Sequence, residues 1–433
     1  MNRICLQPAL LPEIPLSEDC SVLSTPYTIG GRTLHNRIVF QPMEGADGTD
    51  GGAPGELTRR RYRRFAAGGA SVIWMEAVAV CPEGRANPHQ LWLHRGNADA
   101  FRELTGEIRR IARQKHGWEP LIILQATHSG RQSRPVQLPE PICACVNEYL
   151  EERRPMPENC LISDSACDAL PGMYGETARL AAECGFDGID VKCCHGYLLS
   201  EFLSARNRPG RYGGSLENRT RLYLACLEAA KRVCDQTGLL LTTRLGLYEG
   251  FPYPWGFGVS EQGGLDFDPE EPFWLLHQLR DRFGIELLNL TIGNPYVNPN
   301  VNRPYRGCPD EEIETGVARI AAVTHAVQQA FPALSVILSG PSALAGQAPH
   351  YCAAMIRNGS ARLAGFGRMT LAYPEFWNEL CETGSIDRKK CCIACGKCSQ
   401  IMRSGGPAGC PIRDSECYLP LYNQYVKKGE IQR

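Results

Sequence analysis

The sequence predicts a (β/α)8 TIM barrel, an α/β fold, with a small cysteine-rich extension at its C-terminal end. Short apolar runs of strand length alternate with amphipathic stretches of helical period along most of the chain. Eight such runs precede the extension, and most are followed by a helix, which favours a closed parallel barrel over an open sheet. No G-x-G-x-x-G motif follows the first run, which counts against a dinucleotide-binding open sheet.

The predicted elements follow one another in a regular order. Residues 27–34 should form a two-stranded hairpin that turns on Gly30 and Gly31 and caps the barrel. The eight strands are expected at residues 37–40, 71–74, 121–124, 188–191, 239–243, 286–290, 335–338 and 363–366. The helices are expected at residues 58–67, 98–115, 174–184, 222–234, 269–283, 311–330 and 347–358.

The domain organisation is predicted to be simple. Residues 1–385 should form the barrel, and a change of composition opens an extension over residues 386–433. An insertion at about residues 131–170, rich in Pro, Cys and Glu, has the length of a functional lid or an interaction surface. We expect this insertion and the aromatic stretch 248–257 to shape a substrate pocket, and the rings favour a flat substrate.

Composition excludes several classes of function. A chain of 433 residues with a net charge of −1 and interspersed charges predicts no nucleic-acid or membrane-surface partner. It contains no run of 18 apolar residues and no signal-peptide pattern at its start, so we expect a cytoplasmic protein. Twenty-one cysteines in a reducing compartment favour metal ligation or free thiols over disulfides, and an anaerobic host.

The most informative stretch follows the fourth predicted strand. The strand ends in Lys192, Cys193, Cys194, His195 and Tyr197, a cluster of titratable groups, and a polar glycine-rich segment comes next. Barrel enzymes carry their catalytic groups at the C-terminal ends of the strands. This cluster therefore marks a candidate active site.

Other strand ends carry polar residues that a core does not require. Gln125 and His128 follow the third strand, and Arg244 ends the fifth, where a buried guanidinium must meet an anion or an electron-rich oxygen. Loops after the last two strands often bind phosphate in such barrels. Here those loops contain Gly340, Gly367 and Arg368.

The extension carries a cysteine pattern typical of a metal site. Cys392, Cys395 and Cys398 are spaced C-x2-C-x2-C, and Cys410 follows before a proline. This spacing is close to that of an iron–sulfur cluster. A structural zinc site remains the alternative, because four-cysteine zinc sites also use C-x2-C steps.

On the motifs HGYLLSEFLS, RYGGSLENR, GFGR and the tail cysteines, the chain resembles the old yellow enzyme family of flavin-dependent oxidoreductases. Within it the chain is similar to the branch of bacterial 2,4-dienoyl-CoA reductases, over residues 24–410. The resemblance implies FMN at the barrel mouth, with Pro42, Met43 and Ala77 along the flavin, Gln125 on its pyrimidine ring and Arg244 near N1 and O2. It assigns the FMN phosphate to Gly340, Gly367 and Arg368.

The resemblance also implies a reaction. FMN reduced by NAD(P)H gives hydride to a C=C bond conjugated to a carbonyl or thioester, as in enoyl-CoA, dienoyl-CoA, steroids, flavonoids or cyclic enones. Tyr197 matches the family's proton donor. The family's carbonyl-binding pair, His-x-x-His or His-x-x-Asn, is here Lys192 and His195, so the role of the lysine departs from the pattern.

The same branch carries a [4Fe-4S] cluster at the position of Cys392, Cys395, Cys398 and Cys410. Relatives with this cluster usually continue into FAD- and nicotinamide-binding domains, which this sequence lacks. Electrons are therefore expected from NAD(P)H at the FMN or from a separate donor protein such as ferredoxin, and a homo-oligomer is compatible with either.

Three alternatives remain open at this point. One is an amine dehydrogenase or demethylase of the trimethylamine dehydrogenase type, which the lysine at position 192 disfavours because the substrate would be a cation. Another is a flavin-binding electron-transfer subunit, which needs neither His195 nor Tyr197. The third is a zinc-stabilised barrel that binds a sugar phosphate.

Overall fold

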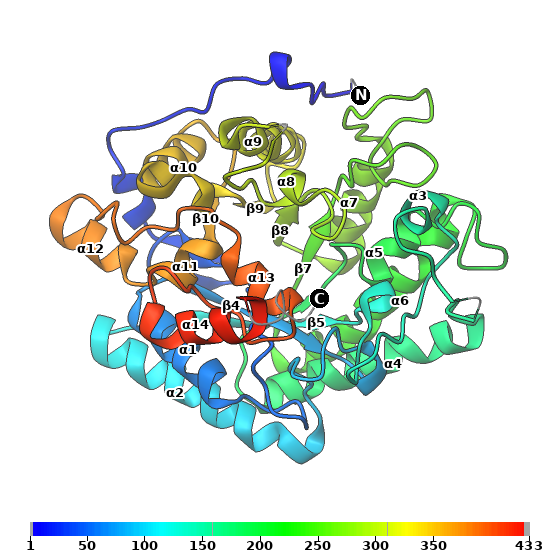
Figure 1. The fold of residues 1–433 in the computed structure, drawn as a ribbon, viewed down its shortest axis with the longest axis horizontal. Coiled ribbons are helices and arrows are strands. Elements are labelled where there is room, and N and C mark those ends of the chain that lie inside the picture. The colour runs from blue at the N-terminus through cyan, green and yellow to red at the C-terminus, as the bar shows by residue number, and fades with distance from the viewer. Residues whose placement is uncertain (1–2, 158, 310, 428–433) are drawn as a thin grey trace.

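The computed structural model describes residues 3–157, 159–309 and 311–427. Eight parallel strands close into a barrel in the order β10-β3-β4-β5-β6-β7-β8-β9, which confirms the predicted (β/α)8 fold (Figure 1). The strands are β3 (Ile38–Phe40), β4 (Val72–Ala79), β5 (Leu121–Thr127), β6 (Gly188–Val191), β7 (Leu240–Gly246), β8 (Leu287–Thr291), β9 (Ser335–Leu338) and β10 (Leu363–Phe366). All eight are almost wholly buried, as expected for parallel strands covered by helices.

Helices surround the barrel and cover the outer face of its strands (Figure 1). The longer ones are α1 (Glu56–Ala67), α2 (Ala98–His116), α4 (Asp164–Glu183), α6 (Leu216–Thr237), α7 (Glu270–Phe283), α9 (Ile313–Ala330) and α10 (Ala348–Arg357). The shorter ones are α3 (Glu148–Glu151), α5 (Leu198–Leu203), α8 (Pro299–Asn302), α11 (Arg368–Ala372), α12 (Phe376–Thr383), α13 (Lys397–Arg403) and α14 (Ser415–Tyr422). Among the described residues, no helix has both the length and the apolar character needed to cross a membrane.

The predicted hairpin is confirmed, and it closes the N-terminal end of the barrel. Strands β1 (Tyr27–Ile29) and β2 (Arg32–Leu34) pair antiparallel through Gly30 and Gly31, whose φ angles of 54° and 72° favour glycine. Ile29 and Leu34 pack into the same apolar cluster as the starts of several barrel strands. The polar strand ends are therefore left open only at the opposite, C-terminal end.

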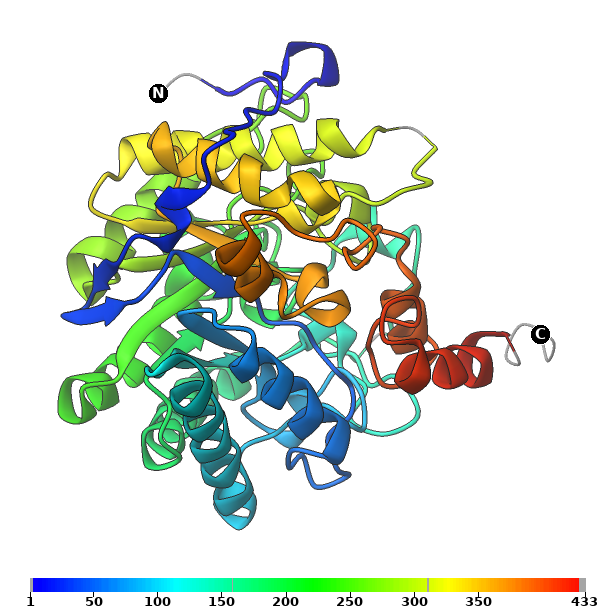
Figure 2. The ribbon, with the colours of Figure 1, turned by 90° about the vertical axis from the view of Figure 1, so that its left-hand side faces the viewer.

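The C-terminal segment lies across that opposite end. Figure 2 shows the hairpin and the helices α13 and α14 on opposite sides of the barrel. Asp414 pairs with Arg60 at 2.6 Å and Arg64 at 2.8 Å, both on α1. Ser399 on α13 accepts a 2.6 Å hydrogen bond from Arg303, which belongs to the loop after β8. The tail thus becomes a wall of the barrel mouth.

The insertion is shorter than predicted and folds back on itself. Helix α4 starts at Asp164, capped by the Ser163 side chain, so the end of the predicted insertion is helical. Cys143 and Cys160 are joined by a backbone hydrogen bond of 2.7 Å. Arg131 donates to Glu201 of α5 at 2.7 Å, which fastens the start of the insertion to the barrel.

Candidate active site

One pocket at the C-terminal ends of the strands collects the barrel residues that the sequence singled out. Every predicted flavin-site and catalytic residue of the barrel lines it, namely Pro42, Met43, Ala77, Gln125, Lys192, His195, Tyr197, Arg244, Gly340, Gly367 and Arg368. His128 lies outside, where its ring accepts a hydrogen bond from the Gly130 amide. The insertion and the stretch 248–257 do not line this pocket, so the prediction that they shape it was wrong. The loop after β8 and α13 form those walls instead.

Asp190, in the middle of β6, orients the floor of the pocket. Its carboxylate accepts hydrogen bonds from Gln125 Nε2 at 2.6 Å, Trp74 Nε1 at 2.8 Å and the Arg244 backbone amide at 2.6 Å. Burial raises the pKa of Asp190 to about 6, against the effect of these donors. Because the amide nitrogen of Gln125 is engaged by Asp190, its carbonyl oxygen is free to face the pocket.

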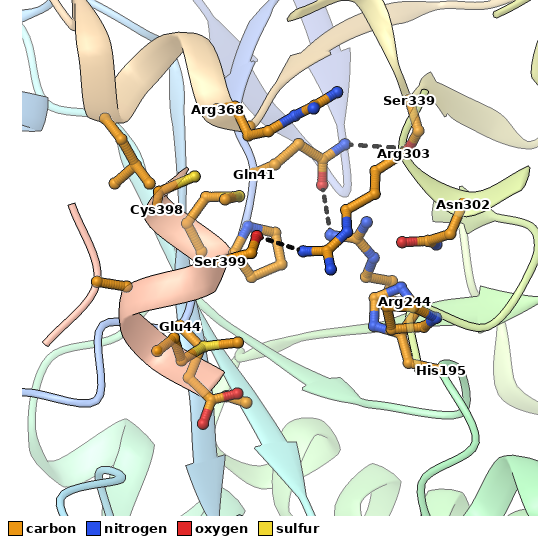
Figure 3. Close-up of a pocket in the computed structure, with 18 of the residues that line it drawn as sticks. Gln41, Glu44, His195, Arg244, Asn302, Arg303, Ser339, Arg368, Cys398 and Ser399 are labelled. Atoms are coloured by element: carbon orange, nitrogen blue, oxygen red, sulfur yellow. Dashed lines mark hydrogen bonds between the residues drawn. The ribbon is translucent and has the colours of Figure 1, made fainter. Parts of the chain in front are cut away.

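Several buried polar atoms of the pocket have no partner within the protein. Gln41 Oε1 accepts from Arg244 Nη1 at 3.0 Å (Figure 3). It also accepts from Asn289 Nδ2 at 2.7 Å. Among the described residues, Arg244 Nε and His195 Nε2, which line the pocket, are buried without a hydrogen bond, and so is Oδ1 of Asn289, the partner of the lining residue Gln41. Such atoms are costly to bury unpaired, so they mark the place of a polar ligand.

The part of the pocket formed by Glu44, Lys192, Tyr197 and Tyr296, the Lys192–Tyr197 corner, contains a carboxylate that the sequence did not predict there. The Tyr197 hydroxyl donates to Glu44 Oε2 at 3.3 Å and lies 3.2 Å from the Tyr296 hydroxyl. Lys192 Nζ sits 3.8 Å from the centre of the Tyr197 ring, a cation–π contact. Burial lowers the pKa of Lys192 and raises that of Glu44, and the attraction between the two charges opposes both effects.

His195 is held as a neutral imidazole. Its backbone lies in the left-handed region, at a φ of 68°, and its half-buried side chain lines the pocket. Burial is the main cause that puts the pKa of His195 well below its usual range, and the nearby charges of Arg244 and Lys192 add to it. A neutral ring can donate one proton and accept another, so His195 Nε2 can serve as a hydrogen-bond donor to a ligand oxygen.

The far end of the pocket carries glycine loops and cations. The backbone amides of Gly367 and Met369 both donate to Ser342 Oγ at 3.1 Å. A Cβ atom on Gly365 would lie 2.1 Å from Gln41 Nε2, so only glycine leaves room for that side chain. Arg368 donates to the Pro304 carbonyl at 2.6 Å, which places it beside Arg303.

Three arginines at this end lack acidic partners. Within the described ranges, no carboxylate forms an ion pair with Arg303, Arg368 or Arg403, all of which line the pocket. Burial, together with repulsion from the other two arginines, lowers the pKa of Arg303 to about 10. Unpaired, mutually repelling cations beside open glycine loops are the surroundings that an anionic group requires.

The four tail cysteines line one small cavity beside the pocket. Cys392, Cys395, Cys398 and Cys410 face it, and Cys398 also lines the main pocket. In the part of the chain that the structure describes, no three Cys, His, Asp or Glu side chains are gathered closely enough to hold one metal ion.

The protein is a closed barrel, and its mouth combines glycine loops, unpaired cations and a Tyr–His pair. These features define a cofactor-binding (β/α)8 protein. Residues 22–256 match the NADH:flavin oxidoreductase / NADH oxidase family, and the chain belongs to it. This confirms the old yellow enzyme family predicted from the motifs, whereas the 2,4-dienoyl-CoA reductase-like branch remains a prediction.

The curated relatives match the chain over part of their length. The chain is 33% identical to an NADPH dehydrogenase of Geobacillus thermodenitrificans over 220 residues, which cover 50% of the chain and 61% of that protein. It is 25% identical to an NADH oxidase of Thermoanaerobacter brockii over 386 residues, 85% of the chain and 52% of that protein. The chain therefore spans less than two thirds of the length of these curated relatives.

Solved structures show the same fold. A 2-naphthoyl-CoA reductase in complex with 2-naphthoyl-CoA has a TM-score of 0.73 at 16% identity, covering 94% of this chain and 58% of that one. The old yellow enzyme homologue from Zymomonas mobilis has a TM-score of 0.62 at 20% identity, covering 85% of this chain and 94% of that one. At these identities the likeness concerns the fold.

Proposed function

We propose that the protein is an FMN-dependent ene-reductase that acts on a C=C bond conjugated to a carbonyl or thioester. The observation that carries this proposal is the set of unpaired donors, Arg244 Nε and His195 Nε2, in one pocket with the Tyr197 phenol. Bound FMN would supply the hydride. The names of the related NADPH dehydrogenases and NADH oxidase support NAD(P)H as the source of its electrons.

The residues present fit FMN. Gln125 and Arg244 would meet the polar edge of the flavin ring, since Asp190 holds both in place. Pro42, Met43 and Ala77 would lie along the ring. The loops of Gly340 and Gly367 with Arg368 would hold the phosphate, and we add Arg303, which lies beside Arg368 and has no acidic partner among the described residues.

The substrate would be positioned by the Lys192–Tyr197 corner. His195, neutral and with Nε2 unpaired, would donate to the carbonyl oxygen, and Tyr197 would give its proton to the α-carbon. Lys192 would act on Tyr197 through its ring more than on the carbonyl, because its ammonium lies 3.8 Å from the ring centre. The cations Lys192, Arg244 and Arg303 around the pocket disfavour an amine substrate.

We further propose a [4Fe-4S] cluster held by Cys392, Cys395, Cys398 and Cys410, in an extension of residues 386–433 attached to a barrel of residues 1–385. The spacing of four soft cysteine ligands and their position around one common cavity support it. Because Cys398 lines both cavities, the cluster would adjoin the flavin. A separate electron-donor protein is compatible with this arrangement.

The proposed function is tested by an anaerobic absorbance spectrum with iron and acid-labile sulfide determined, before and after NADH or NADPH is added. We expect flavin bands, about four iron per chain, and bleaching of the flavin. Oxidation of the reduced flavin by an enone would complete the assignment. Purified protein without flavin, or reduced flavin that no conjugated alkene oxidises, would contradict the proposal.

Replacing Arg303 by Gln should weaken FMN binding roughly ten- to hundredfold, since a hydrogen bond to a charged group contributes about 1.5–3 kcal/mol. Riboflavin, which lacks the phosphate, should bind the variant as well as the wild type. Titration calorimetry of the apoprotein with both flavins measures this difference. Arg306→Gln is the matched control, because Arg306 lies in the same loop but is exposed and outside the pocket. Equal weakening for riboflavin would remove Arg303 from the phosphate site.

A further inference from the structure

The Tyr197 phenol has a second phenol beside it, at the edge of the pocket. Tyr197 is 4% exposed, whereas Tyr296 is 39% exposed, and their hydroxyl oxygens lie 3.2 Å apart. Tyr296 belongs to the loop between β8 and α8. The two hydroxyls form a short line of proton-carrying groups from the buried residue towards the rim.

Glu44 sets the direction of this line. Its Oε2 accepts from the Tyr197 hydroxyl at 3.3 Å, while Asn87 Nδ2 holds its other oxygen at 2.9 Å. A phenol has one proton to donate, so Tyr197 donating to Glu44 is left to accept from Tyr296. The resting order of donation therefore runs from Tyr296 to Tyr197 to Glu44.

Tyr197 cannot easily regain a proton from solvent by itself. The residue is buried, and a substrate in the pocket would cover it further. A phenolate at this position would face the half-buried Glu44 carboxylate, and burial together with this carboxylate holds the pKa of Tyr197 well above its usual range. Lys192, 3.8 Å from the ring centre, is the one cation in contact with that ring among the described residues. The phenolate would be short-lived and would need a proton donor close by.

We propose that Tyr296 is this donor, a relay residue that returns the proton to Tyr197 after each turnover. The inference rests on the proposed function, in which Tyr197 protonates the α-carbon. The Tyr197 O–H bond breaks as a C–H bond forms on the substrate, leaving a Tyr197 phenolate. The Tyr296 proton then passes to Tyr197, and the Tyr296 phenolate takes a proton from water at the rim. The net donor is water, and no group changes oxidation state in these steps. Glu44 is a positioning residue that aligns the two hydroxyls.

The test is Tyr296→Phe in the holoenzyme, with 2-cyclohexen-1-one, cinnamaldehyde and crotonyl-CoA as probe alkenes. Flavin reduction by NAD(P)H and the first oxidation of reduced flavin by alkene should match the wild type, because Tyr197 still carries its proton. Steady-state turnover should fall at least about tenfold, within the range of a lost proton-transfer group. A solvent deuterium isotope effect should then appear on kcat, and imidazole buffer, as a small proton carrier, should restore turnover.

Two further variants make the result specific. Tyr296→His keeps a group that exchanges protons and should retain more turnover than the phenylalanine variant. Tyr27→Phe removes a phenol hydroxyl at the other end of the barrel, where it contacts Ser335, and should change none of these rates. These comparisons separate proton delivery from a change in packing.

The outcomes distinguish the relay from the function on which it rests. If the wild type oxidises its reduced flavin with none of the alkenes, the ene-reductase proposal fails and the relay with it. If the wild type turns over and Tyr296→Phe equals it in steady state and isotope effect, the relay alone is overturned. A slow variant that imidazole does not rescue, with a slow first turnover, would also overturn it, because that pattern belongs to misplaced substrate.

Discussion

Replacing Tyr197 by Phe is expected to leave flavin reduction unchanged and to slow alkene turnover about 10²–10⁴-fold, the range for loss of a general acid. The substitution removes the hydroxyl that contacts Glu44 and Tyr296 but keeps the ring against Lys192. The two half-reactions should be affected differently. Reduction of the flavin by NAD(P)H needs no proton from Tyr197, whereas reduction of the alkene requires a proton on the substrate α-carbon. In contrast to Tyr296→Phe, the defect should already be present in the first turnover.

Rapid mixing measures the two halves separately. The reduced variant is mixed with an enone, and flavin absorbance is followed through a single turnover. Tyr27→Phe is the control variant, because it removes a phenol hydroxyl far from the pocket. Glu201→Gln, at a residue close to Tyr197 in the sequence, is unsuitable because Glu201 pairs with the buried Arg131. If Tyr197→Phe reoxidises with the alkene as fast as the wild type, the proton comes from another group and Tyr197 has no such role.

The barrel could be predicted because its strands have the simplest of sequence signals. Parallel strands buried on both faces appear as short apolar runs, and all eight were found within a few residues. The start of α4 was missed by ten residues because Pro171 lies inside that helix. A proline interrupts one backbone hydrogen bond, so it is normally evidence of a helix boundary. Here the Ser163 cap and burial of Leu170 and Tyr174 outweigh that loss.

The site was predictable only where chemistry follows directly on a strand. Lys192, His195 and Arg244 stand at strand ends, and the pocket contains them all. Glu44 directly follows Pro42 and Met43, but nothing in the local sequence indicates that its carboxylate meets Tyr197. Tyr296 and Arg303 could not be found, because their place depends on how the loop after β8 meets α13. Contacts between segments a hundred residues apart leave no local pattern.

Replacing Cys395 by Ser is expected to lower iron and acid-labile sulfide from about four per chain to near zero, because a hydroxyl is a poor ligand for iron where thiolate is required. FMN should remain bound, since the cysteine cavity shares only Cys398, Arg368 and Leu371 with the flavin pocket. Cys381→Ser is the matched control, because Cys381 is exposed on α12 and outside the cavity. Iron unchanged in the variant, or one zinc per wild-type chain, would overturn the cluster assignment.

The same variant separates two roles for the cluster. Helix α13 carries the proposed ligand Cys398, which lines both cavities, and also Ser399, Met402 and Arg403, which line the main pocket, so loss of the cluster could also disturb this wall. A purely structural cluster predicts that its loss raises KM and speeds proteolysis of the tail while NAD(P)H still reduces the flavin. A cluster that delivers electrons predicts that reduction by a protein donor is lost while reduction by NAD(P)H persists and KM is unchanged. Because KM reports on the pocket wall and reduction by a protein donor reports on electron delivery, the two effects can be measured independently on one protein.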